Sequence, residues 1–104
     1  MKQPDLSKLF DEFTAKQKET LIKKNNDYAD TDALSNFKLG GQITGVGPVK
    51  DCLVLIATKV ARLGNLTSGK TPNNESIADS VLDLANYAFL LHAILKDESD
   101  ISGR

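Results

Sequence analysis

The sequence ESIADSVLDLANYAFLLHAIL, residues 75–95, is the longest continuous helical pattern in the chain. Because successive residues of an α-helix are about 100° apart, apolar residues three and four positions apart come to lie on one face. Other apolar residues flank the opposite side, so the pattern is apolar nearly all round, which is typical of a buried helix. We therefore expect this helix to form the centre of the fold. Its principal apolar face comprises Ile77, Val81, Leu84, Ala88, Leu91 and Leu95.

A narrow polar strip is set into the other side of the same helix. The strip consists of Glu75, Asp79, Asp83 and Asn86, at spacings of four, four and three residues. Carboxylates that are carried into a protein interior need cationic partners, metal ions or protonation. The pattern therefore predicts that cations from elsewhere in the chain, or bound ions, face this strip.

A second helix is predicted from Pro48, a favourable first helical residue, to about Asn65. Lys59 projects from the middle of its apolar face, and Arg62 lies at the margin of that face. Burial of an unpaired ammonium group is expensive, so we expect these cations to meet the acidic strip. Two interpretations remain open. One is an ion-pair network between two helices, and the other is a polar pocket that binds phosphate oxygens through the cations and a sugar, base or metal through the strip.

The first predicted helix covers Leu6 to Lys24, and a connection of 18 residues, Asp30 to Gly47, joins it to the second. Connections longer than roughly 12 to 15 residues without secondary structure are uncommon in compact domains and are often functional. We expect Tyr28, Asn36 and Phe37 to close the polar pocket as a wall or lid. The alternative is a surface loop with Phe37 inserted into the core.

Local signals fix the predicted ends of these helices. Asp5 is a plausible N-cap of the first helix, and Asn74 is a plausible N-cap of the third. Residues 64–74 then form the turn between the second and third helices. Residues 97–104 are polar, and we expect them to form a frayed tail.

Length and composition predict one small intracellular domain. The 104 residues carry 13 basic and 14 acidic side chains, a balance that favours neither a nucleic-acid-binding nor a membrane-surface protein. The single cysteine excludes an internal disulfide and fits a reducing compartment. No long apolar run or signal-peptide pattern occurs, so we expect a soluble, cytoplasmic protein.

Several short motifs have simpler explanations than function. GNLTSGKT, residues 64–71, matches the P-loop pattern, but a P-loop follows a strand and opens a helix, and neither is predicted here. Asn74-Glu75-Ser76 matches a glycosylation acceptor, which has no meaning inside a cell. His92, the only histidine, and Cys52 are expected to pack as ordinary side chains.

Four stretches together resemble the nucleotide modification associated domain 1 family, which is common in phage and prophage genomes and is distantly similar to the all-α MazG-like nucleoside triphosphate pyrophosphohydrolases. The resemblance covers roughly residues 21–95, about three quarters of the chain. The four stretches are KNNDYAD (24–30), SNF (35–37), KVARLGNL (59–66) and ESIADSVLDLANYAFLL (75–91).

The resemblance implies an oligomeric, helical, nucleotide-handling fold. In MazG-like enzymes, an E-x-x-E pair on one helix and an E-x-x-D pair on the next hold magnesium. The position similar to E-x-x-E here begins with Lys59 and ends with Arg62, so both carboxylates are replaced by cations. Asp79 matches the aspartate of the second pair, but Ser76 stands three residues before it, and Glu75 is one residue further back. Lys59 and Arg62 can hold a phosphate electrostatically, but they cannot generate a metal-bound hydroxide.

These observations together predict a compact, all-α, MazG-like domain of three main helices, with a long loop between the first and second and a core within about residues 6–96. We expect a homo-oligomer, because three helices of this apolarity expose much surface when alone.

The predicted function is that of a small phage-type nucleotide-binding protein, without hydrolysis, which serves nucleotide modification or sequesters a nucleotide signal of host defence. One alternative is a magnesium-dependent pyrophosphohydrolase with Glu75 and Asp79 as metal ligands, helped by Asp83 or Asp51. Another is a structural or protein-interaction module without a ligand. The predicted ligand-binding residues are Lys59, Arg62, Asp79, Asp83, Asn86, Tyr28, Asn36 and Phe37.

Overall fold

The computed structural model describes the backbone of residues 1–28, 32–69 and 76–102, and the side chains of these ranges except 26–28 and 101–102. All regular structure in these ranges is helical, which confirms the predicted all-α class. The helices are α1 (Gln3–Tyr28), α2 (Ser35–Thr44), α3 (Pro48–Thr67) and α4 (Ile77–Ser102).

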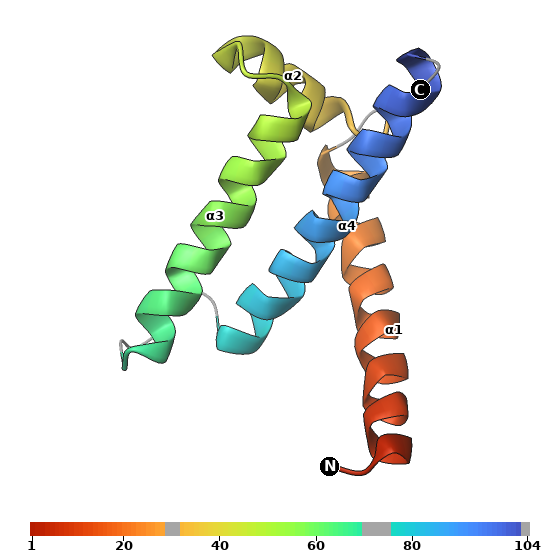
Figure 1. Ribbon diagram of the computed structural model, residues 1–104, viewed down its shortest axis with the longest axis vertical. Helices are drawn as coiled ribbons and strands as arrows, with labels where there is room; N and C mark the ends of the chain where they lie inside the picture. The colour runs from red at the N-terminus through yellow and green to blue at the C-terminus, as the bar shows by residue number, and fades with distance from the viewer. Residues whose placement is uncertain (29–31, 70–75, 103–104) are drawn as a thin grey trace.

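The arrangement of the helices is built around the α3/α4 pair (Figure 1). These two helices run in opposite directions and share the most extensive contact in the chain. The short helix α2 crosses the beginning of α3. Helix α1 contacts α4 with its C-terminal half, whereas its N-terminal half extends away from the other helices.

The predicted long loop between the first two helices is wrong, because most of it forms α2. The glycines within this segment obscured the helix. Gly41 is buried where α2 meets the start of α3, and a Cβ there would collide with the carbonyl carbon of Gly47. Gly45 ends α2 in the left-handed conformation, with φ of 78°. The first of these glycines permits close packing and the second terminates the helix, so a glycine-rich sequence is compatible with a helix here.

Several helix ends also differ from the prediction. Helix α1 begins before Asp5, which therefore lies in the first turn and is not the cap. Helix α4 begins at Ile77 and not near Asn74, which lies outside the described residues. The predicted frayed tail is helical to residue 102, where Lys96 and Asp100 form an ion pair of 3.1 Å one turn apart.

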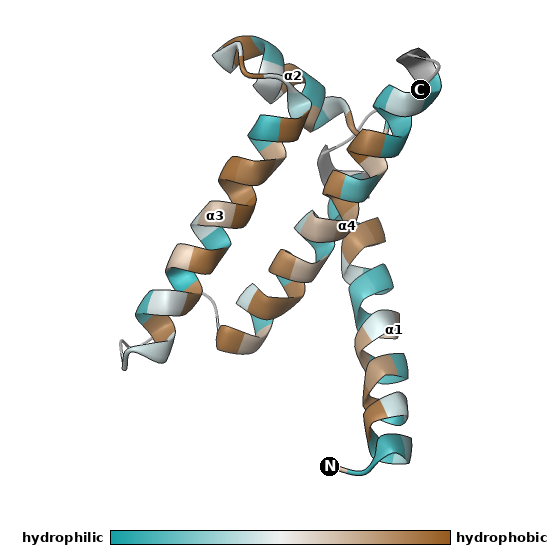
Figure 2. Ribbon diagram, in the orientation of Figure 1, coloured by the Kyte–Doolittle hydropathy of each residue, from teal (hydrophilic) through white to brown (hydrophobic). Residues whose placement is uncertain are grey.

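Helix α4 is less buried than its nearly all-round apolar pattern predicts. Ile77, Val81 and Leu95, from its principal apolar face, are 43%, 41% and 51% exposed. Ser80 is fully buried instead, and Asn86 is only 5% exposed. Asp83 and Asn86 of the polar strip therefore lie inside the molecule, as expected, whereas Asp79 and part of the principal apolar face are exposed. Hydrophobic residues accordingly occur along most of the length of α3 and α4 (Figure 2).

The core is small and lies where α2, α3 and α4 meet. Its buried members are Leu34, Phe37, Cys52 and Ile94. The radius of gyration is 15.7 Å, against about 13 Å for a compact domain of this length. The chain by itself is thus less compact than the sequence predicts, because half of α1 lies outside the body.

Helix α4 also meets, by length and composition alone, the criterion for a membrane-spanning helix over Ile77–Asp100. The core helices of soluble proteins pass the same test. Asp83 lies within this span, and its carboxylate forms two ion pairs with lysines of the same chain.

Substitution of two helical glycines, Gly41 and Gly64, tests this packing, because the two changes should alter stability in opposite directions. Gly41→Ala forces a methyl group against backbone atoms, so we expect the free energy of unfolding to fall by about 1–3 kcal/mol. Gly64→Ala is the matched control, because a Cβ there meets nothing within 4 Å. We expect Gly64→Ala to raise the free energy of unfolding by about 1 kcal/mol through helix propensity. Urea denaturation followed by circular dichroism measures both, and an equal effect of the two substitutions would contradict this account of α2.

Candidate functional site

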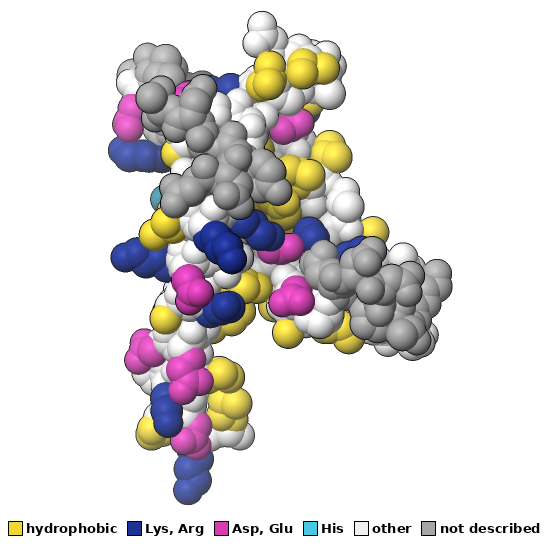
Figure 3. Space-filling model, turned by 180° about the vertical axis from the view of Figure 1, so that it is seen from behind, with side chains coloured by type: hydrophobic (Ala, Val, Ile, Leu, Met, Phe, Trp, Pro, Cys, Tyr) yellow, Lys and Arg dark blue, Asp and Glu magenta, His cyan; other side chains and the backbone are white. Residues whose placement is uncertain are grey.

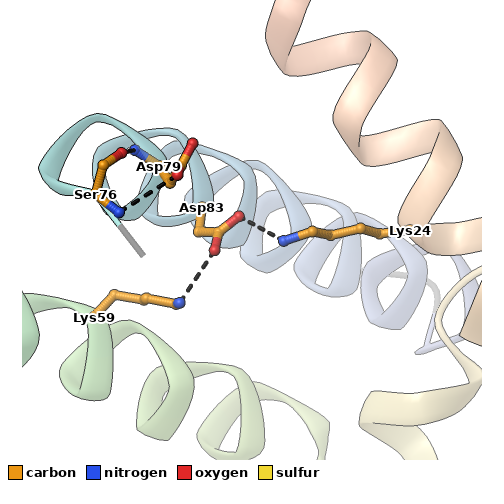
Figure 4. A network of polar contacts seen from close by, with 5 residues as sticks. All are labelled: Lys24, Lys59, Ser76, Asp79 and Asp83. Carbon is orange, nitrogen blue, oxygen red and sulfur yellow. Dashed lines mark hydrogen bonds and ion pairs between the residues drawn. The ribbon is translucent and has the colours of Figure 1, made fainter. Parts of the chain in front are cut away.

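The candidate site is the junction of α1, α3 and α4, where the carboxylate of Asp83 lies between two lysines (Figure 4). Lys24 of α1 approaches one carboxylate oxygen at 2.7 Å, and Lys59 of α3 approaches the other at 3.1 Å. The side chains of Asp83 and Lys59 are only 13% and 16% exposed. The expected pairing between the second predicted helix and the polar strip is therefore confirmed for this pair.

The charge state of Asp83 follows from two opposing effects. Burial is the largest single influence and raises its pKa, because it disfavours the charged form. Hydrogen bonds from Lys24 and Lys59, together with their positive charges, outweigh burial and bring the pKa of Asp83 below its ordinary value. Asp83 is thus a stable anion that holds two cations at the junction.

Two cavities adjoin this ion-pair cluster, and Lys24 and Asp83 border both. The first, which we call the inner cavity, has a volume of about 410 Å³ and lies between α1, α2, α3 and α4. The second, which we call the charged cavity, has a volume of about 440 Å³ and is bordered by α1, α3 and α4. On the face opposite to that of Figure 1, basic and acidic side chains lie side by side around the middle of the molecule (Figure 3).

The inner cavity combines apolar walls with a few polar groups, as small-molecule sites commonly do. Phe37 of α2 and Tyr87 of α4 supply aromatic rings to its wall. Asn36 and Asn86 supply amides, and Asp51 of α3 supplies a carboxylate. The charged cavity instead brings three cations together with two carboxylates. Its charged members are Lys16, Lys24, Arg62, Asp79 and Asp83.

Asp79 has a local structural task in addition to its place beside the charged cavity. Its backbone N–H donates to the Ser76 hydroxyl at 3.0 Å, and its carboxylate accepts from the Ser76 N–H at 3.4 Å. This reciprocal pair is a capping box, and it explains why α4 begins at Ile77 (Figure 4).

The predicted metal ligands include Glu75, which lies outside the described residues. Within the described part of the chain, no group of three or more His, Cys, Asp and Glu side chains is arranged to hold a metal ion. Asp79 and Asp83 are instead engaged by Ser76 and by the two lysines. These residues alone do not fit a magnesium centre.

The predicted ligand-binding residues divide between the two cavities. Asn36, Phe37 and Asn86 border the inner cavity, Arg62 and Asp79 border the charged cavity, and Asp83 borders both. Lys59 borders neither but is ion-paired to Asp83. The side chain of Tyr28 lies outside the described residues.

Sequence reasoning missed Lys24 and Tyr87 and named Asp51 only as an alternative metal ligand. Lys24 begins the KNNDYAD stretch, which was the available signal, in the last part of the first predicted helix. In the structure α1 ends at Tyr28, and Lys24 pairs with Asp83 of α4.

Cys52, His92 and the P-loop match, for which no function is predicted, lie within or beside helices. Cys52 is fully buried, its thiol approaches the Tyr87 carbonyl at 3.5 Å, and burial raises its pKa. The ring of His92 packs beside Phe89 with 6.3 Å between ring centres. The described part of the P-loop match begins inside α3, where no strand precedes it.

Comparison of the chain with models of protein families, with curated proteins and with solved structures yields no match in any of the three. The family resemblance therefore rests on the sequence motifs alone.

Replacement of Asp83 by asparagine tests the ion-pair cluster. We expect Asp83→Asn to lower the free energy of unfolding at pH 7 by about 1–3 kcal/mol, because the largely buried Lys59 ammonium loses its carboxylate partner. The folded-state pKa of Asp83 is below its unfolded value of 3.8, so its contribution is present above about pH 4 and is lost as the pH falls through the folded pKa. Denaturant titrations between pH 7 and pH 2.5 measure the fall in the free energy of unfolding. This fall should be smaller in Asp83→Asn than in the native chain.

Two further residues make this test specific. Asp32 keeps part of the acid dependence in the variant, because a hydrogen bond from Lys38 lowers its pKa as well. Asp100→Asn is the matched control, since its pair with Lys96 is exposed and lies within one helix. A loss of stability in Asp100→Asn equal to that in Asp83→Asn would contradict a special role for the cluster.

Proposed function

We propose that this chain binds a nucleotide or nucleotide-derived small molecule at the junction of α1, α3 and α4, without hydrolysing it. The observation that carries the proposal is the convergence of Lys24, Lys59 and Arg62 from two helices on a junction that is flanked by two cavities. Ammonium and guanidinium groups bind phosphate oxygens through charge-assisted hydrogen bonds. A phosphate that enters the charged cavity would compete with Asp83 for Lys24.

The absence of hydrolysis in this proposal rests on the chemistry of the residues. Lys59 and Arg62 occupy the two positions at which MazG-like enzymes are expected to carry metal-binding carboxylates. Cations can neutralise the charge of a bound phosphate, but they cannot lower the pKa of a water molecule as a metal ion does. The same junction therefore favours holding a nucleotide over cleaving it.

The biological setting that we propose follows from the family resemblance. It is a phage or prophage protein in the bacterial cytoplasm that serves nucleotide modification or sequesters a nucleotide signal of host defence. The nearly balanced charge of the chain supports a small-molecule ligand over a nucleic acid.

Nucleotide binding is tested by thermal shift with the four common nucleoside triphosphates and with cyclic dinucleotides, because a ligand of the folded state raises its stability. We expect a shift with at least one of them. We expect Lys24→Ala and Arg62→Ala each to weaken the binding of that ligand by about tenfold to hundredfold, measured by calorimetry.

Controls separate binding from the two alternatives. Lys96→Ala removes an exposed cation of α4 outside both cavities and should leave the affinity unchanged. Magnesium-dependent release of pyrophosphate, abolished by Asp79→Asn, would overturn the non-hydrolytic part of the proposal. A loss of stability in Lys59→Ala and Arg62→Ala without an effect on nucleotide binding would favour a purely structural module.

We propose in addition that the chain assembles with copies of itself. Leu6, Leu9 and Phe10 are about half exposed on the half of α1 that extends from the body. Ile77 and Val81 are similarly open on the outward face of α4. Two apolar helix faces left uncovered on one chain are typical of a surface that is buried between subunits.

Light scattering after size exclusion tests the assembly. We expect a mass that is a multiple of 11.3 kDa for the native chain. The double substitution Ile77→Glu and Val81→Glu should reduce it to the monomer mass, because charges on this face cannot be buried without partners. Gln42→Glu, on an exposed position of α2, is the control. A native mass of 11.3 kDa at tens of micromolar protein would contradict the assembly.

A further inference from the structure

The buried amide of Asn86 has no partner that accounts for its burial. The side chain is 5% exposed, and neither its nitrogen nor its oxygen has a hydrogen-bond partner within the described structure. Buried amides are nearly always hydrogen-bonded, so an exception calls for an explanation. Asn86 is one of the residues that border the inner cavity, so a molecule bound there lies next to this amide.

A second polar side chain, that of Asp51, borders the same cavity. The carboxylate of Asp51 is half-buried, and it makes no hydrogen bond or ion pair within the described ranges. It is held against the backbone of α2, since a Cβ on Gly40 would lie 2.7 Å from one of its oxygens. The glycine thus leaves room for the carboxylate at the cavity wall.

The remaining wall of the inner cavity suits a flat, mostly apolar group. Phe37 and Tyr87 contribute rings, and Leu55 and Leu90 contribute aliphatic surface. Aromatic rings bind planar groups by offset stacking or by edge-to-face contact. Lys24, at the boundary with the charged cavity, marks the side on which a phosphate would lie.

The two polar groups define which edge of a planar ligand fits. The amide of Asn86 offers one acceptor and one donor side by side, whereas an ionised carboxylate only accepts. Their complement is an amino group next to a ring nitrogen acceptor, as in adenine and cytosine, and asparagine pairs with adenine through such an edge. A carbonyl oxygen at the same position would face the carboxylate of Asp51 and be repelled.

We propose that the inner cavity is a base-recognition pocket that selects an amino-bearing base through Asn86 and Asp51. This inference rests on the proposed function, because it assigns the base to the inner cavity and the phosphates to the charged cavity. It adds Asp51 to the site and gives Asn86 a single role, which is to read the edge of the base.

Calorimetry with ATP against ITP, and with CTP against UTP, tests the selection, since each pair differs in an amino group and its neighbouring ring position. We expect the amino-bearing member of at least one pair to bind at least about tenfold more tightly. Asn86→Leu should lose this preference and weaken binding, while it raises the thermal midpoint of the ligand-free protein, because an unsatisfied buried amide is replaced by an apolar group of similar shape. Asn65→Leu, at an exposed asparagine of α3, is the matched control.

Two variants examine Asp51 separately. Asp51→Asn should bring the affinities for ATP and ITP together, because an amide at this position can donate to a carbonyl oxygen. Gly40→Ala changes no residue that lines the cavity, yet its methyl group would displace the Asp51 carboxylate and should reduce the same preference.

The outcomes separate this inference from the proposed function. If none of the four triphosphates binds, this inference is overturned, and the proposed function falls with it only if GTP and the cyclic dinucleotides also give no thermal shift. If they bind with equal affinity, or with a preference that Asn86→Leu and Asp51→Asn leave unchanged, only the base-recognition pocket is overturned. A lower thermal midpoint for Asn86→Leu, with the preference intact, would show that the amide is structural.

Discussion

The two ion pairs of Asp83 are the interaction on which the arrangement of the helices depends. This carboxylate meets Lys24 of α1 and Lys59 of α3, so one side chain of α4 links three helices. Helix α1 has few other contacts with the body, and its N-terminal half has none of the enclosed core residues. Since a largely buried carboxylate is stable only while it is paired, the position of α1 is tied to the charge state of the junction.

Much of this junction is predictable from local sequence. The helical spacings of residues 75–95 predicted α4, and Pro48 predicted the start of α3. The position of Lys59 among leucines predicted that its ammonium group meets the polar strip. These features are local, because periodicity and capping depend on residues within a turn or two. The family-level assignment remains a prediction, since it depends on motifs that the fold does not test.

The errors came from tertiary packing, which local sequence does not contain. Gly41 suggested a loop, yet it lies in α2 because the backbone of Gly47 approaches too closely for any side chain. Helix α4 was expected to be buried nearly all round, yet Ile77 and Val81 are exposed, because periodicity cannot choose the buried side of a helix that is apolar over most of its surface. The choice was made by Lys24 and Lys59, which hold Asp83 and the adjacent Asn86 inside.

The two kinds of buried polar group carry different weight for function. An ion pair such as Lys59 with Asp83 is sufficient to explain its own burial, because each charge satisfies the other, and it is equally compatible with a structural module. The buried amide of Asn86 has no hydrogen-bond partner in the ligand-free chain, so its burial does not stabilise the fold. Residues that reduce stability without an evident gain in packing are typical of functional sites. The inner cavity, more than the charges beside it, is therefore the feature that favours a ligand.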